Sequence, residues 1–390
     1  MMKICFINTD IYGVDGISRV LSVLTNELSK KHDITVVTFE KEDCVKKDRY
    51  NLSSRVHVDF WPALYKKCYI RRAFHKLNQQ LPIIRKLNSK AIYDWIYLPK
   101  HMQDYWVEYI NKNQFDVVVG VQAKLAIILG SIADRISCKT VGWQHNSYEA
   151  YLENKGKYYW NQDFLFEKYI SRLDRYVVLN EHDEEQYRIK KNIDTVTIYN
   201  PKSFVSDRKS ECLKKRFICV GGLRPAKGFD YVIEAFEEFA KYNSEWVLDI
   251  FGRGDDQKRL EKMILSRGLE ERVKLKGVSD QIQNELYQSG AFLLPSRWEG
   301  MPMVVLEAME MGLPVVSFDI TAINPLITNE KEGLIVKRYD TNGFAAAMAR
   351  MAEDDGFRIR CSRNAVIKAK FFDVKVISEQ WEKMLVDLYG

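Results

Sequence analysis

Two glutamates with seven residues between them are the most informative candidates for chemistry in this chain. They are Glu299 and Glu307, in the stretch EGMPMVVLEAMEMGLP. Pro302 suits the first turn of a helix, where its missing N–H would have no partner anyway, and Gly312 followed by Pro314 ends that helix. We therefore expect Glu299 in a loop and Glu307 about one turn inside a helix, half-buried among apolar residues. A carboxylate in that position needs hydrogen-bond donors, which a sugar diol would supply.

The loop ahead of this helix suits an anion. The backbone N–H groups of Gly300 and Met301 precede the positive end of the helix, and such a terminus binds phosphate. A simpler interpretation is that Glu307 faces solvent and Glu299 only caps the helix. The spacing alone does not decide between the two.

Two cations stand at a second predicted strand-to-helix junction. The loop LRPAKG, which contains Arg224 and Lys227, follows an apolar strand over 217–222 and precedes a helix. Cations at this position would neutralise a diphosphate and stabilise it as a leaving group. The alternative is that both are solvated surface residues.

The setting of the two glutamates, EGMPMVVLEAM, resembles the signature of family-4 glycosyltransferases. These are retaining enzymes of the GT-B fold that use nucleotide-diphosphate sugars. The resemblance assigns Glu307 to the ribose hydroxyls and Glu299 to the donor sugar and its phosphate. It assigns Lys227 to the phosphates. The family also has an Arg five residues before that Lys, where this chain has Gly222, so we expect Arg224 to substitute.

The resemblance is specific over 216–336 and weaker elsewhere, where it implies further site residues. His145 follows a predicted strand, at the edge where open α/β sheets bind ligands, and the family often has a His there near the donor sugar. Gly16, in the first glycine-containing loop, would face the donor phosphates. The backbone at Val278 would meet the base.

The elements that position these residues alternate between strand and helix, as in doubly wound α/β sheets. A chain of 390 residues exceeds one ordinary core. We expect two Rossmann-like domains facing across a cleft, with the acceptor on the first and the donor on the second. The resemblance adds a C-terminal helix that returns to the first domain. The expected ranges are 1–201 with 373–390 for the first domain, 202–372 for the second, a charged linker over 202–215, and an insertion-bearing helical region over 41–113.

The composition is that of an ordinary globular protein, at 46% hydrophobic and 29% charged residues. No apolar run approaches the roughly 18 residues of a membrane span, and no signal peptide is visible at the start. The seven cysteines occur singly, which is typical of a reducing compartment. We expect a cytoplasmic location.

The region 61–93 contains no acidic residue and mixes cations with apolar residues. A basic amphipathic segment of this kind predicts peripheral binding to an anionic membrane surface, although it could also be merely solvated or bind an acidic glycan. No RNA-binding motif accompanies it, so we expect no nucleic-acid partner. Aromatic residues expected at the membrane boundary are Tyr93, Trp95, Tyr97, Tyr105 and Trp106.

The predicted reaction is transfer of a hexosyl unit from a nucleotide-diphosphate sugar to a hydroxyl. UDP is the commonest nucleotide in such enzymes, and the acceptor would be a glycan or lipid-linked sugar in cell-surface polysaccharide synthesis. No metal-ligand cluster is visible, so we expect no metal and no cofactor. Two alternatives remain open: a sugar-nucleotide epimerase with the same cleft, and a glycan-binding protein without catalysis.

Overall fold

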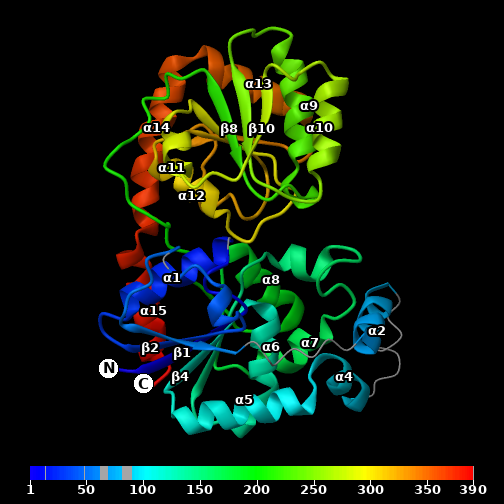
Figure 1. Cartoon of the computed structure of the whole chain (residues 1–390), viewed down its shortest axis with the longest axis vertical. Helices are drawn as coiled ribbons and strands as arrows, with labels where there is room; N and C mark the ends of the chain where they lie inside the picture. The colour runs from blue at the N-terminus through cyan, green and yellow to red at the C-terminus, as the bar shows by residue number, and fades with distance from the viewer. Residues whose placement is uncertain (14, 48, 62–68, 81–89, 390) are drawn as a thin grey trace. The chain divides into compact units, whose positions relative to one another are not determined.

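The computed structural model describes residues 1–13, 15–47, 49–61, 69–80 and 90–389. It contains two compact units (Figure 1). Unit 1 consists of Met1–Pro201 and Val374–Gly390, and unit 2 of Lys202–Asp373. Each unit has its own parallel sheet with helices packed against it. The predicted pair of α/β units is confirmed.

Unit 1 is built on a parallel sheet with the strand order β3-β2-β1-β4-β5-β6-β7. Its strands read as nearly continuous apolar runs because helices cover a parallel sheet on both faces. The expected helical region over 41–113 contains α2, α4 and α5, but it also contributes the strand β3, which was not predicted. β3 pairs along its full length with Ile34–Thr38 of β2, which extends the sheet by one edge strand. The strands are β1 (Lys3–Asn8), β2 (Asp33–Thr38), β3 (Val56–Phe60), β4 (Val117–Val121), β5 (Lys139–Trp143), β6 (Arg175–Val178) and β7 (Val196–Thr197).

The last helix of the chain, drawn in red in Figure 1, belongs to unit 1 and packs beside the first helix. Trp381 is fully buried there, with its ring 6.2 Å from Phe6 and 4.9 Å from Trp143. The predicted return of the C-terminal helix is therefore confirmed. The helices of unit 1 are α1 (Gly16–Leu28), α2 (Tyr69–Gln80), α4 (Lys90–Tyr97), α5 (Lys100–Asn113), α6 (Gln122–Ile132), α7 (Phe164–Tyr169), α8 (Glu181–Lys191) and α15 (Val374–Asp387).

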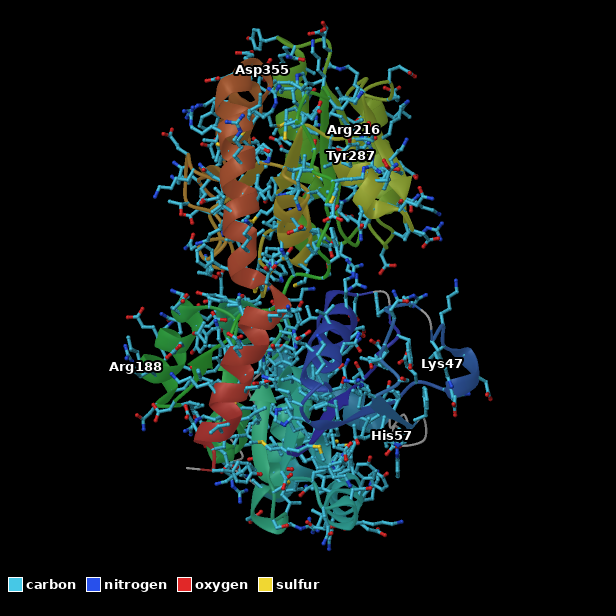
Figure 2. All side chains as sticks on the ribbon, turned by 90° about the vertical axis from the view of Figure 1, so that its left-hand side faces the viewer. Lys47, His57, Arg188, Arg216, Tyr287 and Asp355 are labelled. Carbon is cyan, nitrogen blue, oxygen red and sulfur yellow. The ribbon has the colours of Figure 1, made fainter. Side chains whose placement is uncertain are left out.

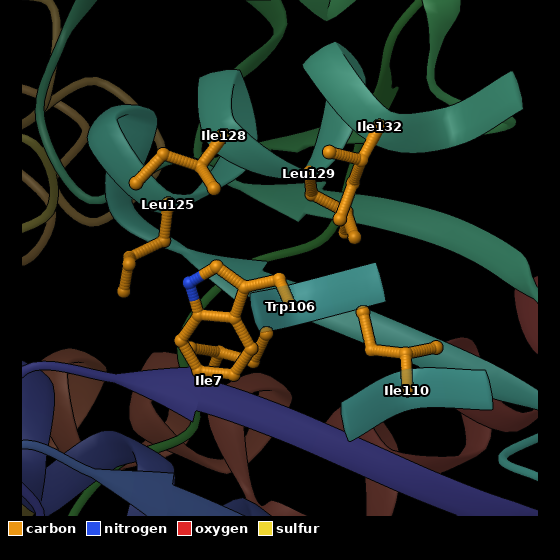
Figure 3. A pocket seen from close by; sticks show the side chains of 7 residues that line it. All are labelled: Ile7, Trp106, Ile110, Leu125, Ile128, Leu129 and Ile132. Carbon is orange, nitrogen blue, oxygen red and sulfur yellow. The ribbon is translucent and has the colours of Figure 1, made fainter. Parts of the chain in front are cut away.

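The interior of unit 1 contains a small apolar cavity between β1, α5 and α6 (Figure 3). Trp106 lines it and is only 1% exposed. The expectation that Trp106 lies at a membrane boundary was therefore wrong, because α5 turns this side chain into the core. Tyr105 packs on Trp61, with ring centroids 4.1 Å apart. The remaining lining is aliphatic, which makes the cavity a packing void rather than a place for a sugar nucleotide. This aliphatic lining consists of Ile7, Ile110, Leu125, Ile128, Leu129 and Ile132.

Unit 2 is built on a parallel sheet with the order β10-β9-β8-β11-β12-β13. Its strands are β8 (Arg216–Val220), β9 (Val247–Phe251), β10 (Val273–Gly277), β11 (Ala291–Leu294), β12 (Val315–Phe318) and β13 (Gly333–Val336). Its helices are α9 (Phe229–Ala240), α10 (Gln257–Ser266), α11 (Ile282–Tyr287), α12 (Met303–Glu310), α13 (Thr341–Glu353) and α14 (Asp355–Ala369).

The residues expected to form a linker, 202–215, belong to the folded body of unit 2. Lys202 is 4% exposed, and Cys212 is fully buried. At the start of β8, Arg216 (labelled in Figure 2) lies 2.8 Å from Asp249 and 2.7 Å from Glu285. Within the stretch itself, Lys202 and Lys209 pair with Glu310 and Lys215 pairs with Glu245, so these cations make ion pairs within unit 2 and the stretch is not a free tether.

Candidate active site

Most of the predicted site residues lie at one edge of the sheet in unit 2. All six strands are parallel, so their carboxyl ends meet at that edge, where α/β sheets bind ligands. Lys227 follows β8, Val278 follows β10 and Glu299 follows β11. Glu307 lies on α12, which begins beyond the same loop as Glu299.

The structure brings Lys227 and Glu299 into direct contact. The Lys227 Nζ lies 2.7 Å from Glu299 Oε1, with side chains 28% and 11% exposed. The Ser296 hydroxyl donates to the same oxygen at 2.6 Å. Since β8 and β11 are neighbours in the sheet, the two loops after them place a cation and a carboxylate at one point. Such a pair can accompany a phosphate and an adjacent sugar hydroxyl.

A glycine allows the two loops to approach this closely. Gly228 has φ +66°, and a Cβ there would lie 1.9 Å from the carbonyl oxygen of Pro295. The Arg297 N–H donates to the Ala226 carbonyl at 2.8 Å. The Lys-Gly pair therefore provides the cation at Lys227 and, at Gly228, the close backbone contact that fixes its position.

Arg297, in the loop after β11, ties that loop to α9. Its guanidinium donates to both carboxylate oxygens of Asp230, at 3.0 and 2.7 Å, and lies 4.3 Å from the Tyr231 ring centroid. Burial opposes ionisation of Asp230, but the bonds from Arg297 outweigh it and lower the pKa of that carboxyl. This bidentate pair supports the loop that carries Glu299.

Arg224 lies beside Gly222, the position at which the family arginine is missing. A Cβ built on Gly222 would lie 3.7 Å from Arg224 Nε, so the Arg224 side chain folds back toward Gly222. Arg224 is exposed, and among the described residues no hydrogen bond or ion pair engages its guanidinium. A cation in this state is available to a phosphate.

Glu307 is almost completely buried, at 1% exposure. The interpretation in which it faces solvent is therefore wrong, and so is half-burial. Glu299 does not cap the helix either, because the cap position of α12 is Pro302 and no side chain bonds there. The Ser203 hydroxyl donates to Glu307 Oε1 at 2.7 Å. Sequence reasoning missed Ser203, which lies 104 residues away in the chain.

The other candidates in unit 2 lie in the loops after β10 and β11. Gly300 and Met301 are buried in the loop ahead of α12. Val278 is 50% exposed and follows Gly277, whose φ is +71°. Of these three candidates, only Val278 leaves side-chain surface at the sheet edge.

His145 and Gly16 belong to unit 1. His145 follows β5, and its ring centroid lies 4.4 Å from that of Trp143. Burial lowers the pKa of His145 to about 3, so the imidazole is neutral at working pH. No residue in the described part of the chain bonds its Nε2. Gly16 is the exposed first residue of α1. The close approach in that loop falls at Gly13, where a Cβ would lie 2.4 Å from Asp10 Oδ1.

A buried polar network fixes the residue before His145. Gln144 donates to Asp183 at 2.9 Å and accepts from the hydroxyls of Tyr176, at 3.0 Å, and Tyr187, at 2.6 Å. Burial raises the pKa of Asp183 to about 7, against opposing hydrogen bonds from its neighbours. Sequence reasoning missed this network, because its members come from β6, α8 and the end of β5.

Comparison with known proteins gives a family match for one part of the chain. Residues 206–367 match the model described as glycosyl transferases group 1. An uncharacterized glycosyltransferase of Haemophilus influenzae is 22% identical over 350 residues, covering 85% of this chain and 96% of that protein. A TarM structure from S. aureus, with fondaparinux, α-GlcNAc-glycerol and UDP, superposes with a TM-score of 0.77 at 14% identity, over 99% of this chain and 100% of that one. This chain is a GT-B glycosyltransferase.

Another relative is the Escherichia coli UDP-Gal:α-D-GlcNAc-diphosphoundecaprenol α-1,3-galactosyltransferase. It is 33% identical over 156 residues, which cover 39% of this glycosyltransferase and 40% of the relative. The match spans less than half of the relative's length. The family assignment favours the predicted transferase over an epimerase or a binding module.

The described part of the chain contains neither a metal-ligand cluster nor a membrane-spanning helix. No group of three or more His, Cys, Asp or Glu side chains gathers there as metal ligands would. None of the helices in the described ranges is long and apolar enough to cross a bilayer.

Proposed function

We propose that this glycosyltransferase moves a hexosyl unit from a UDP-sugar, with retention of the anomeric configuration, to a hydroxyl of a glycan or lipid-linked sugar in cell-surface polysaccharide synthesis. The observation that carries the proposal is the contact of Lys227 with Glu299 at the sheet edge, one short loop ahead of the buried Glu307. The names of the relatives supply the donor and acceptor classes, since one includes UDP-Gal and a diphosphoundecaprenol-linked sugar and another structure contains UDP.

In this proposal the residues of unit 2 hold the donor. Glu307 accepts hydrogen bonds from the ribose hydroxyls, Glu299 meets the donor sugar, and Gly300 and Met301 present N–H groups to the phosphates. Lys227 and Arg224 balance the charge that the diphosphate gains as the glycosidic bond breaks. These groups and the end of α12 supply the positive charge, so the reaction would need no metal ion.

The residues of unit 1 would have the roles that the family resemblance gives them. His145 stays neutral and would bond a hydroxyl of the donor sugar, and Gly16 would face the phosphates. A donor phosphate oxygen would take the proton of the acceptor hydroxyl on the face that the leaving group vacates, which gives retention. Val278 would contact the base through its backbone.

The test is a transfer assay with a panel of nucleotide sugars and acceptors, analysed by NMR for the anomeric configuration of the product. A product from a UDP-sugar with the donor's configuration is expected. Conversion of the donor in the absence of acceptor to an isomeric nucleotide sugar would contradict the proposal and favour an epimerase. Inverted product would overturn the assignment of retention.

The proposal includes docking to an anionic membrane from the cytoplasmic side. Helix α2 carries Ile70, Phe74 and Leu77, which are 62%, 43% and 43% exposed and lie at helical spacing. Trp95 of α4 is 44% exposed and contacts Phe74, with ring centroids 6.1 Å apart. Apolar and aromatic side chains on a cationic helix suit a headgroup region. Each Lys or Arg near such a surface adds about 1 kcal/mol.

Liposome flotation tests this docking. Phe74→Ser should reduce recovery with anionic vesicles, while Leu213→Ser, which changes a 56% exposed leucine of unit 2, should not. Neutralising the cations with Gln should also reduce recovery; the positions are Arg71, Arg72, Arg85 and Lys86. Residues 62–68 and 81–89 of the predicted segment lie outside the described residues. Equal recovery on neutral and anionic vesicles would contradict membrane docking and leave the transferase proposal intact.

A further inference from the structure

The segment Lys202–Ser206, here called the connecting segment, follows Pro201, where the first part of unit 1 ends, and is bonded to α12. Two carboxylates of that helix hold it. The Ser203 hydroxyl donates to Glu307 at 2.7 Å, and the Ser206 N–H donates to Glu310 at 2.9 Å. Glu307 and Glu310 are three positions apart, so they lie on one face of the helix. The face of α12 that includes the proposed ribose residue is thus bonded to the connecting segment.

A buried ion-pair cluster fixes the start of this segment. The Lys202 Nζ lies 2.5 Å from Glu310 and 2.5 Å from Asp373, the last residue of unit 2. Its backbone N–H donates to the Phe372 carbonyl at 2.8 Å. The side chains of Lys202 and Glu310 are 4% and 3% exposed. Both places where the chain passes between the units therefore meet in one cluster on α12.

Charge complementarity stabilises this cluster. Glu310 also accepts from Lys209 at 2.5 Å. Burial opposes ionisation of Glu310, but the bonds from Lys202 and Lys209 outweigh it and lower the pKa of this carboxyl. Removing one partner from such a buried group is strongly unfavourable. The cluster therefore keeps Ser203 at a fixed distance from Glu307.

The bond from Ser203 determines how Glu307 can meet a ligand. A buried carboxylate is tolerated only when hydrogen bonds compensate for its lost hydration. The hydroxyl of Ser203 holds Oε1 and so restricts rotation of the carboxylate plane. Because this ordering is achieved on folding, less conformational freedom is lost when a diol binds.

We propose that Ser203 is a positioning residue for the donor nucleotide: it orients Glu307 for the two ribose hydroxyls, and the Lys202–Glu310 pair holds Ser203 in place. This inference rests on the proposed role of Glu307 as the ribose residue. It adds a residue outside α12 and its loop to the machinery of donor binding.

Calorimetric titration of the full-length protein with UDP and with 2′,3′-dideoxy-UDP tests the inference. Ser203→Ala should weaken UDP binding about three- to tenfold, the range expected for one net hydrogen bond. It should leave binding of dideoxy-UDP unchanged, since that ligand has no diol to orient. Ser203→Thr, which keeps the hydroxyl, should restore the preference for UDP.

A matched control lies three residues away. Among the described residues, the hydroxyl of Ser206 bonds only within its own loop, where it donates to the carbonyl of Arg208 and accepts from its N–H, while the Ser206 backbone N–H donates to Glu310. Ser206→Ala should therefore bind both nucleotides as the unaltered protein does. Equal weakening of UDP and dideoxy-UDP by Ser203→Ala would overturn the inference, because it would indicate a structural effect only.

Glu307→Ala separates this inference from the proposed function. If Glu307→Ala loses the preference for UDP over dideoxy-UDP but Ser203→Ala keeps it, the role of Ser203 is overturned and the ribose assignment stands. If Glu307→Ala keeps UDP affinity and preference, the ribose assignment falls and the inference falls with it.

Discussion

Replacing Lys227 by alanine tests the proposed donor site most directly. Its Nζ lies 2.7 Å from Glu299 and is the cation closest to that carboxylate in the loops described above. A hydrogen bond to a charged group contributes about 1.5–3 kcal/mol, which is roughly 10- to 150-fold in affinity for UDP. The diphosphate gains charge as the sugar leaves, so the variant should lose more in kcat/KM, about 10²- to 10³-fold.

The same change should have little effect on folding. The Lys227–Glu299 pair is partly exposed, at 28% and 11%, and exposed pairs contribute about 0–1 kcal/mol. Glu299 keeps its bond from Ser296 in the variant. We therefore expect the melting temperature to fall by at most about 4 °C.

The assay combines initial rates at varied donor concentration, UDP titration and a thermal melt. Lys215→Ala is the matched control, since Lys215 pairs with Glu245 at 2.5 Å next to the opposite end of β8. It should leave kcat, KM and UDP affinity unchanged. If Lys227→Ala lowers the melting temperature but keeps both kcat and UDP affinity, Lys227 is structural and the reasoning fails.

Three further predictions address strain, pH and metal. Gly228→Ala should destabilise the protein by about 3 kcal/mol or more, because alanine would be strained at a φ of +66° and its Cβ would lie 1.9 Å from a carbonyl oxygen. Gly268→Ala is the control, since Gly268 has a φ of +63° but nothing lies within 4 Å of its Cβ. Equal losses of stability for the two variants in thermal melts would contradict the role of the close approach. The Asp183 carboxyl has a pKa raised to about 7 by burial, so the folded state holds a proton that the unfolded state loses near 3.8. The stability this contributes is complete below about 3.8 and is lost as the pH rises to about 7; Asp183→Asn should therefore flatten the melting temperature against pH in this window, and an unchanged slope would refute the assignment. Incubation with EDTA should leave the transfer rate unchanged, and a rate that falls and is restored by Mg²⁺ would show that the cations near Lys227 do not suffice.

The sequence by itself determined the local elements of this protein. Apolar runs separated by polar loops predicted the parallel strands, since such strands are buried on both faces. Pro302 and Gly312 predicted the bounds of α12, which the structure gives as Met303–Glu310. Lys227 and Gly228 identified the loop after β8 as a candidate site, because a cation at a strand-to-helix junction can bind a phosphate and a glycine allows a close backbone approach.

Only the tertiary structure decided which of these residues meet. Lys227 and Glu299 are 72 residues apart, and Ser203 and Glu307 are 104 apart; sheet order and loop packing bring them together, and neither leaves a local signal. The same limit explains Trp106. An amphipathic helix shows that one face is apolar, but not whether a core or a lipid surface covers it, and α5 buries that side chain to 1% exposure. Whether a side chain is buried depends on which residues of the rest of the chain pack against it. The segment 202–215 resembles a linker in its sequence, but it is part of unit 2 because it pairs with residues of α12, which its own sequence does not specify.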